Sequence, residues 1–256
     1  ATREEMQRAR EDATTAETGH DADVALVTVK SFDTEAAAES LASCDVGCVL
    51  SLQNGLTEET LADGLDAPVL AGTATYGADL VEPGRVRCTG VGRVVIGALA
   101  GGTHPLAERV GKAFRDAGIE TLVAADMPRR RWEKLAVNAG INAVTALARV
   151  ENGALAAGEA HDVAHRAARE TARVARLERV RLPNRVAREA IDRVVEQTAA
   201  NRSSMLQDVQ RGARTEIDAI NGAVVRAGEA LAVSTPTNRM LYDMIKALED
   251  MHAASY

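Results

Sequence analysis

The chain has 256 residues, a formal net charge of −7 at pH 7 and an aromatic content of only 2%. This length allows one or two domains with a sizeable core, which must be built mainly from aliphatic side chains. The acidic balance argues against a nucleic-acid-binding protein, and no apolar run reaches the length of a membrane span. We therefore expect neither nucleic acid nor a membrane among the partners of this protein.

Strand and helix patterns alternate along the first half of the chain. Runs rich in valine, leucine and alanine predict strands at residues 23–29, 46–52 and 69–75. Helical stretches begin between them, near Thr34 and Thr57. This order of strand, helix and strand favours a parallel sheet with crossover helices.

A turn signal follows these strands. Residues 85–89 and 93–98 flank the sequence Gly-Val-Gly at 90–92, which predicts that the two runs pair as a hairpin. A helix is predicted at residues 104–117 and a last strand at 120–124. These elements extend the α/β pattern to the middle of the chain.

From Met127 onward the pattern is wholly helical. We therefore predict two domains, a sheet domain at residues 1–125 and an all-helical domain at residues 126–256. In an open parallel sheet, ligands bind beyond the carboxyl ends of the strands. The site is accordingly expected in the cleft between the two domains.

Lys134, Asn138 and Asn142 stand four residues apart in the run RWEKLAVNAGINAVTAL. A step of four keeps side chains on one face of a helix, so the row presents one ammonium and two carboxamides in roughly one direction. The residues between them are largely apolar, which indicates a buried helix where unpartnered polar groups are costly. The row is therefore either a polar seam satisfied by a neighbouring helix or a site that faces a ligand.

A second polar set lies in the segment at residues 201–225. Ser204 and Asp208 are one helical turn apart, and Thr215 is typical of an N-cap, which places Glu216 in the first turn of the following helix. The helix dipole favours a carboxylate there, so Glu216 alone has a structural explanation. Two helical segments that each carry polar residues on an apolar background nevertheless favour a site.

Three further candidates follow the predicted strands. Lys30 ends the first strand, Asn54 follows the second, and the backbone of Ala78 follows the third, which are positions where ligand contacts are expected. Lys30 is also compatible with an ordinary surface lysine. Asn54 precedes a glycine and is therefore also typical of a turn, and both interpretations of Asn54 can hold together.

The histidines and cysteines give no metal-binding pattern. His161 and His165 are a helical turn apart, but no third ligand is near them in the sequence. Cys44, Cys48 and Cys88 form no C-x-x-C pair and are interpreted as small buried thiols. We therefore predict no metal site, and the odd cysteine count and the lack of a signal peptide favour a reducing cytoplasm.

Together these segments resemble the ketopantoate reductases (2-dehydropantoate 2-reductases). The matching pieces occur in the family's order and cover nearly the whole chain from about Asp23. They are VTVKSFDT around Lys30, SLQNGL around Asn54, GTATYGA ending at Ala78, WEKLAVNAGIN at 132–142, ENGAL around Asn152 and SSMLQDVQRGARTEIDAINGAVV at 203–225. The two long helical motifs are specific, whereas VTVK and QNG are weak by themselves.

The resemblance has one gap. Family members begin with a strand, a G-x-G-x-x-G turn and a helix, which hold the cofactor pyrophosphate. This sequence opens ATREEMQRARED, which is polar and helix-prone, and it contains no such turn. The resemblance therefore implies an incomplete Rossmann-type parallel sheet domain that lacks about one strand and one helix. An all-helical domain of the 6-phosphogluconate dehydrogenase-like type is expected to follow.

For the site, the resemblance implies NADPH as cofactor, with NADH as the alternative, and a small 2-keto acid as substrate. The catalytic set would contain Lys134 and Glu216, with Lys134 as the general acid. The substrate-binding set would also contain Asn54, Asn138, Asn142, Asn152 and Ser204. The cofactor-binding set would contain Lys30, Asn54, Ala78 and Glu216. Glu216 would orient the cofactor or the lysine, and Asp208 would support the residues that touch the ligands.

The expected activity is therefore NADPH-dependent reduction of ketopantoate to pantoate, in pantothenate and coenzyme A biosynthesis. Two alternatives stay open. One is a reductase of a related 2-keto or β-hydroxy acid with the same architecture, and the other is an inactive truncated reductase that acts only by association. An exposed sheet edge in a truncated chain would also allow pairing into a homodimer.

Overall fold

The computed structural model of the protein describes residues 21–253, so the segment predicted to be polar and helix-prone at the start lies outside the described residues. The described chain falls into two compact units. Unit 1 contains the residues up to Val29, together with Asp33–Gln53 and Glu58–Met127. Unit 2 contains Lys30–Phe32, Asn54–Thr57 and the chain from Pro128 onward.

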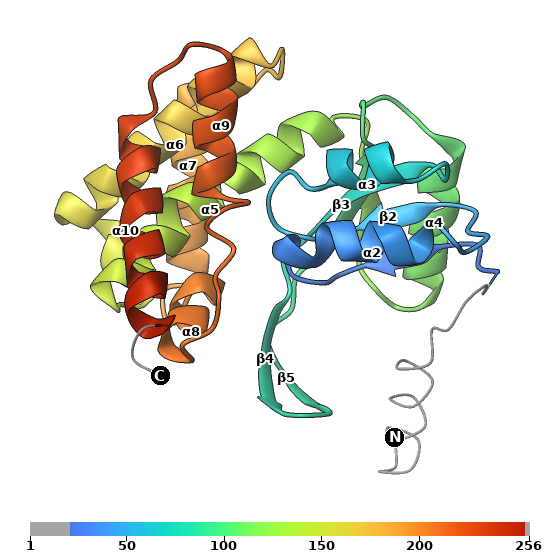
Figure 1. The fold of residues 1–256 in the computed structure, drawn as a ribbon, viewed down its shortest axis with the longest axis horizontal. Helices are drawn as coiled ribbons and strands as arrows, with labels where there is room; N and C mark the ends of the chain where they lie inside the picture. The colour runs from blue at the N-terminus through green and yellow to red at the C-terminus, as the bar shows by residue number, and fades with distance from the viewer. Residues whose placement is uncertain (1–20, 254–256) are drawn as a thin grey trace. The chain divides into compact units, whose positions relative to one another are not determined.

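Unit 1 is built around a five-stranded sheet with the order β1-β2-β3-β6-β7, of which Figure 1 labels β2 and β3. Its strands are β1 (Ala25–Val27), β2 (Val49–Ser51), β3 (Val69–Ala74), β6 (Val94–Ala98) and β7 (Thr121–Val123). β1, β2 and β3 are parallel, β6 runs antiparallel to β3, and β7 runs parallel to β6. The prediction of a Rossmann-type parallel sheet followed by a helical domain is confirmed, although the antiparallel pair of β3 and β6 was not predicted.

Helices cover both faces of this sheet because successive residues of a strand point to opposite sides. On β2, Val49 packs in a cluster with α2 (Thr34–Leu41) and α3 (Glu58–Gly64). Its neighbour Leu50 packs in a second cluster with α4 (Pro105–Asp116). The parallel strands are therefore held between two helical layers, and their carboxyl ends are fixed at one edge.

The predicted hairpin of residues 85–89 with 93–98 is wrong. β5 (Arg85–Gly90) pairs instead with β4 (Gly77–Glu82), which precedes it in the chain. The turn between them contains Gly84 with a φ of +81°, a conformation that favours glycine. β6 joins the main sheet because its apolar side chains are buried there, whereas β5 is exposed along most of its length.

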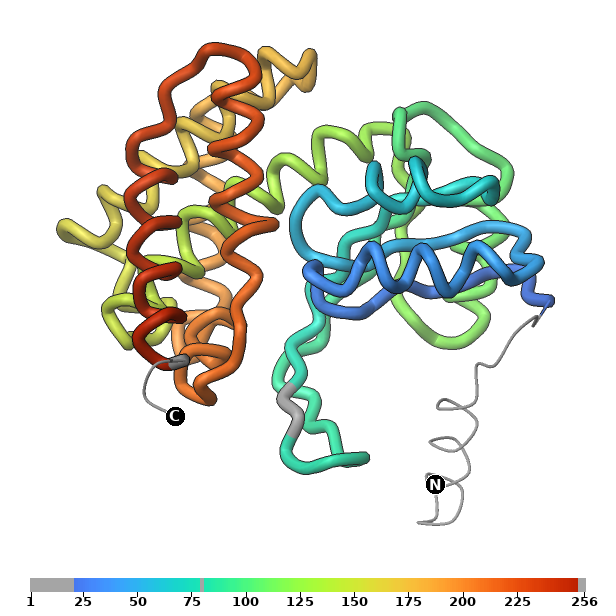
Figure 2. Tube along the Cα trace, viewed as in Figure 1, coloured from blue at the N-terminus to red at the C-terminus, as the bar shows by residue number. Residues whose placement is uncertain are grey.

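Unit 2 is all-helical, and Figure 2 shows the path of its chain. Its helices are α5 (Met127–Ala148), the 3-10 helix η2 (Asn152–Ala156), α6 (Gly158–Leu177), α7 (Asn184–Gln197), α8 (Ser204–Gln210), α9 (Asn221–Ala230) and α10 (Pro236–Ala253). The core is rich in alanine. Small residues let the helices approach closely, since a Cβ at Gly140 of α5 would meet the carbonyl oxygen of Ala164 of α6 at 2.8 Å. Between residues 21 and 253, no helix combines the length and the apolar character that crossing a membrane requires.

Asp218 links the segment before α9 to α10. The hydroxyl of Tyr242 donates to its Oδ1 at 2.9 Å, and Nζ of Lys246 donates to its Oδ2 at 3.3 Å. Burial alone raises the pKa of this carboxyl, but the hydrogen bond from Tyr242 and the charge of Lys246 outweigh burial and hold the pKa below its ordinary value. The folded state therefore favours the ionised carboxylate.

We expect Asp218→Asn to lower the free energy of unfolding by about 1 kcal/mol at neutral pH, a modest loss because solvent screens a side chain that is 34% exposed. The folded pKa lies below the unfolded pKa. The contribution of the Asp218 carboxylate to the free energy of unfolding is therefore complete above its pKa in the unfolded chain. This contribution is lost as the pH falls through its pKa in the folded protein.

Urea unfolding of Asp218→Asn at neutral pH and at about pH 2 measures this contribution. Asp243→Asn is the control, because Asp243 lies exposed on the same helix α10. A loss of stability that is equal at both pH values would contradict the role of the ionised carboxylate.

Candidate active site

Lys134, Asn138 and Asn142 lie one turn apart on α5, as their spacing predicts. Lys134 and Asn138 are half-buried, and Asn142 is buried. Among the residues that the structure describes, the side-chain amides of Asn138 and Asn142 have no hydrogen-bond partner. If a neighbouring helix satisfied this polar row, its side chains would hydrogen-bond to these amides. The lack of such bonds within the described residues favours a helix face that receives a ligand.

A hydrogen bond joins the start of α8 to α5 beside this row. The hydroxyls of Thr145 and Ser203 lie 2.7 Å apart, and the Thr145 hydroxyl also bonds the backbone carbonyl of Asn142 at 3.1 Å. Ser203 is the N-cap of α8, since its hydroxyl accepts from the N–H of Leu206. Sequence reasoning missed Ser203, although a serine before an apolar helix is an N-cap signal. The predicted site residue Ser204 follows it and is exposed in the first turn.

Lys30 and Asp208 form an ion pair in unit 2, with Nζ of Lys30 2.7 Å from Oδ2 of Asp208. The Asp208 side chain on α8 is only 10% exposed. Burial raises the pKa of Asp208, the hydrogen bond and charge of Lys30 oppose this rise, and the charge of Glu216 adds to it. Asp208 therefore holds the ammonium of Lys30 against α8.

The carboxylate of Glu216 connects the two short segments that unit 2 takes from the strand ends. Its Oε2 accepts a hydrogen bond from Nδ2 of Asn54 at 2.9 Å, and its Oε1 accepts from the backbone N–H of Ser31 at 3.0 Å. Glu216 is buried, and two donors compensate the loss of water around its charge. Two pairs of residues that were each predicted for the site are thus in contact, Lys30 with Asp208 and Asn54 with Glu216.

The prediction that Glu216 lies in the first turn of a helix is wrong. The segment around it forms turns, and α9 (Asn221–Ala230) begins further on. Thr215 accepts from the N–H of Ile217, two residues on, which is the pattern of a side-chain turn. Helical geometry is interrupted at Ile220, where φ and ψ are −100° and −91°. The two hydrogen bonds described above, and no helix dipole, therefore hold the carboxylate.

Close packing fixes the same two short segments against the chain before α9. Gly55 has a φ of +92°, and a Cβ there would meet the carbonyl oxygen of Ala219 at 2.6 Å. The guanidinium of Arg214 lies over the ring of Phe32, 4.5 Å from its centroid. Since only glycine fits after Asn54, the Asn-Gly pair both makes a turn and positions the Asn54 amide.

Two candidates lie outside these contacts. Asn152 begins η2, where its Nδ2 donates to the hydroxyl of Thr198 at 2.8 Å. Its Oδ1 is buried and has no hydrogen-bond partner within the described part of the chain. Ala78 belongs to unit 1 and pairs with Cys88 in the β4–β5 hairpin. Cys88 is exposed, so its interpretation as a buried thiol is wrong.

Unit 2 therefore offers two kinds of polar group. The α5 row combines an ammonium with two amides, which can bind a small molecule that carries a carboxylate and a carbonyl oxygen. The buried carboxylates of Asp208 and Glu216 bind other site residues and hold them in place. This arrangement suits the binding and protonation of a small acid.

Two family models match the chain. The model described as ketopantoate reductase PanE/ApbA matches residues 2–101, and the model described as ketopantoate reductase PanE/ApbA C terminal matches residues 126–249. The two matches are in chain order and together cover most of the sequence.

Curated relatives are similar over most of their length. The 2-dehydropantoate 2-reductase of Archaeoglobus fulgidus is 41% identical over 230 residues, which is 90% of this chain and 77% of that protein. The 2-dehydropantoate 2-reductase of Halobacterium salinarum is 44% identical over 230 residues, which is 88% of this chain and 76% of that protein.

Solved structures have the same fold. A PanE/ApbA family ketopantoate reductase from Ralstonia eutropha JMP134 has a TM-score of 0.82 and 34% identity, with 90% of this chain and 77% of that chain covered. A ternary structure of D-mandelate dehydrogenase with NADH and anilino(oxo)acetate has a TM-score of 0.85 and 25% identity, with 93% and 78% covered. The matched models and the identity to curated relatives show that the chain belongs to the ketopantoate reductase family.

Proposed function

We propose that this protein catalyses the NADPH-dependent reduction of 2-dehydropantoate to pantoate, a step of pantothenate and coenzyme A biosynthesis. The observation that carries the proposal is the row of Lys134, Asn138 and Asn142 on α5, whose two amides no described residue satisfies. The substrate offers a carboxylate, a ketone and a hydroxyl to such a row. The activity named for the relatives from Archaeoglobus fulgidus and Halobacterium salinarum supports the same substrate.

Lys134 is the general acid in this proposal. A nicotinamide cofactor, when bound, would supply the hydride that reduces the ketone carbon of the substrate. Negative charge grows on the ketone oxygen, where the ammonium of Lys134 stabilises it and delivers a proton. The half-buried position of Lys134 strengthens this interaction, because fewer water molecules screen the charge.

Four polar residues bind the substrate hydroxyl and carboxylate in this proposal. Asn138 and Asn142 continue the row of Lys134 and offer both donors and acceptors. Asn152 offers an Oδ1 without a partner in the described chain, and Ser204 offers an exposed hydroxyl at the start of α8. The hydrogen bond between Thr145 and Ser203 supports the placement of Ser204 beside the α5 row.

The residues after the parallel strands fit a dinucleotide. The carboxyl ends of β1, β2 and β3 share one edge of the sheet, which is where dinucleotides bind in sheets of this type. Lys30 offers an ammonium to the phosphate or ribose, Asn54 an amide that touches both ligands, and Ala78 a backbone contact. The sequence contains no G-x-G-x-x-G turn, so we assign no residue to the pyrophosphate.

The two buried carboxylates orient the residues that touch the ligands. Asp208 holds Lys30, and Glu216 holds Asn54. We assign cofactor binding to residues 1–125 and catalysis to residues 126–256. Lys30 and Asn54 follow strands β1 and β2 in the sequence, but they belong to unit 2 together with the carboxylates that hold them. This arrangement supports a role of both residues in aligning the ligands. A homodimer in the cytoplasm stays a prediction.

A second candidate function is the reduction of a related 2-keto acid with NADH. The structural similarity to D-mandelate dehydrogenase, at a TM-score of 0.85, favours this candidate. That structure contains NADH and anilino(oxo)acetate, and the enzyme's name gives D-mandelate, a 2-hydroxy acid, as the compound it acts on. The same α5 row can bind the carboxylate and ketone of such a substrate.

A direct assay distinguishes these functions. Oxidation of NADPH or NADH is followed with 2-dehydropantoate and, separately, with the 2-keto acid that corresponds to mandelate. We expect the highest kcat/KM for NADPH with 2-dehydropantoate. A higher kcat/KM for the aromatic keto acid would replace the proposal with the second candidate. If calorimetric titration detects no binding of either cofactor and no turnover is seen, the proposed reductase activity is rejected, and the remaining alternative is an inactive truncated reductase that acts only by association.

A further inference from the structure

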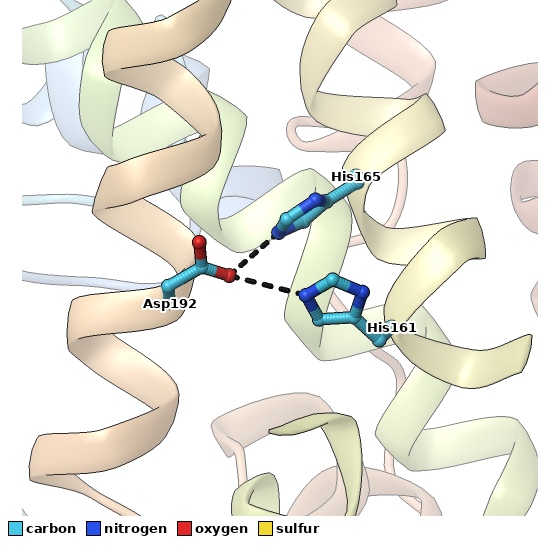
Figure 3. Close-up of side chains that lie close together, drawn as sticks. All are labelled: His161, His165 and Asp192. Atoms are coloured by element: carbon cyan, nitrogen blue, oxygen red, sulfur yellow. Dashed lines mark hydrogen bonds and ion pairs between the residues drawn. The ribbon is translucent and has the colours of Figure 1, made fainter. Parts of the chain in front are cut away.

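Three potential metal ligands gather between α6 and α7 of unit 2 (Figure 3). His161 and His165 lie one turn apart on α6, and Asp192 points toward both from α7. The Oδ1 atom of Asp192 lies 2.6 Å from Nε2 of His165 and 3.3 Å from Nε2 of His161. The two imidazole rings are tilted by 44°, and their centroids are 3.9 Å apart. One ligand atom from each residue therefore lies in a small shared region.

The spacing of these atoms suits a transition-metal ion. Zn²⁺ binds histidine nitrogen and carboxylate oxygen at about 2.0–2.2 Å, so neighbouring ligand atoms of a tetrahedral site lie about 3.3 Å apart. The three ligand atoms here lie within 4.8 Å of one another, so small side-chain rotations bring them to that spacing. Two imidazoles and one carboxylate are also the ligand types of zinc sites that keep a position for water.

Packing fixes the helices that carry these ligands and leaves the outer side open. Ala168 of α6 and Ile191 of α7 are fully buried in one core cluster. The side chain of His165 is 8% exposed, that of His161 is 25% exposed and that of Asp192 is 50% exposed. The ligands therefore stand on rigid elements, while an ion can reach them from solvent and retain bound water.

Arg188 opposes metal binding in the metal-free protein. Its Nε donates to Nδ1 of His165 at 3.2 Å, so the ring proton lies on Nε2 and faces Asp192. A metal at Nε2 requires that proton to move to Nδ1, where it meets the N–H of Arg188, and the guanidinium also repels a cation. Because Arg188 is exposed, it can turn into solvent, and it weakens the site without closing it.

We propose that His161, His165 and Asp192 form a binding site for one divalent transition-metal ion, with Zn²⁺ as the preferred ion and water completing its coordination. The histidine pair has no third ligand near it in the sequence, but α7 supplies one 27 residues after His165. None of the three ligands belongs to the proposed catalytic set. The ion therefore cross-links α6 to α7 and stabilises the helical unit.

Metal titration of the whole chain tests this site. After treatment with a chelator, calorimetry with Zn²⁺ is expected to show one ion per chain. At a free Zn²⁺ concentration of about 100 times Kd, Tm is expected to rise by about 5–10 °C. Co²⁺ in the same protein is expected to give the visible absorption bands of a low-coordinate site. The proposal is overturned if Zn²⁺ does not bind or if saturating Zn²⁺ leaves Tm unchanged.

Substitutions at the two more exposed ligands locate the ion. Asp192→Asn and His161→Gln are expected to weaken Zn²⁺ binding by about 100-fold or more, since the loss of a direct ligand costs more than the roughly 10- to 100-fold loss that follows removal of a residue that only supports a ligand. Glu196→Gln is the matched control, because Glu196 lies exposed one turn further along α7, and it is expected to leave Kd unchanged. Arg188→Leu is expected to tighten binding by about threefold or more, since it removes a competing donor and a like charge. Equal Zn²⁺ affinity in Asp192→Asn and the unsubstituted protein would place the ion elsewhere and overturn the proposal.

Discussion

Lys134→Ala is expected to lower kcat for 2-dehydropantoate reduction by about two to four orders of magnitude, which is the range for the loss of a general acid. The substitution removes both the proton donor and the positive charge that stabilises the developing oxyanion. KM is expected to change less, because Asn138 and Asn142 remain on the same face of α5. Steady-state oxidation of NADPH measures both parameters.

Two further variants separate the roles of Lys134. Lys134→Arg retains the charge, but a guanidinium does not release its proton near neutral pH, so only part of kcat is expected to return. Lys112→Ala is the control, because Lys112 is an exposed lysine on α4 that pairs with Asp116, and it is expected to leave kcat unchanged. Cofactor titration and thermal unfolding test whether each variant is folded. Turnover of Lys134→Ala close to that of the unsubstituted protein would contradict the assignment.

Local pattern was sufficient for most elements of unit 1. The strands β1, β2 and β3 each fall inside a predicted apolar run, because burial between two helical layers selects apolar residues at successive positions. The partner strands of β5 and β6 were not predictable in the same way. A turn at Gly90 and a turn at Gly84 are both compatible with the local sequence.

Contacts distant in sequence decide between these two turns. Thr75, at the end of β3, accepts at its hydroxyl from the N–H of Arg93, and its own N–H donates to the carbonyl of Arg93. A Cβ at Gly92 would meet the Thr75 backbone at 2.5 Å. Gly92 therefore allows β6 to approach β3 closely. From the neighbouring residues alone, the same glycine indicates a hairpin turn.

The candidate site also contains features that local sequence predicts and contacts that it does not predict. The row from Lys134 to Asn142 was predictable because helical periodicity is a local property. The contact of Lys30 with Asp208 spans 178 residues, and that of Asn54 with Glu216 spans 162. The residues next to Asp208 and Glu216 in the sequence do not indicate these partners. Only the fold of unit 2 brings the two carboxylates to Lys30 and Asn54. Asp192 faces the histidines of α6 for the same reason.

Glu216→Ala is expected to lower kcat/KM by about 100-fold, because Asn54 loses the acceptor that positions its amide and small misplacements in a site are costly. The free energy of unfolding is expected to fall by about 2–4 kcal/mol, since the N–H of Ser31 and the amide of Asn54 both lose a charged partner. Glu216→Gln keeps one oxygen acceptor, so intermediate values are expected. Steady-state kinetics and urea unfolding measure the two effects.

A double-mutant cycle tests whether Glu216 acts through Asn54. If it does, the double variant Glu216→Ala and Asn54→Ala loses little more kcat/KM than the worse single variant, because both substitutions remove the same positioned amide. If Glu216 instead contacts the cofactor by itself, the two losses multiply. Glu229→Ala is the control, because Glu229 is an exposed glutamate on α9 whose ion pair with Arg239 involves no proposed site residue, and it is expected to leave kcat/KM unchanged. If the two losses of kcat/KM multiply in the double variant, the positioning role of Glu216 is rejected. A direct contact of Glu216 with the cofactor then explains its effect on kcat/KM.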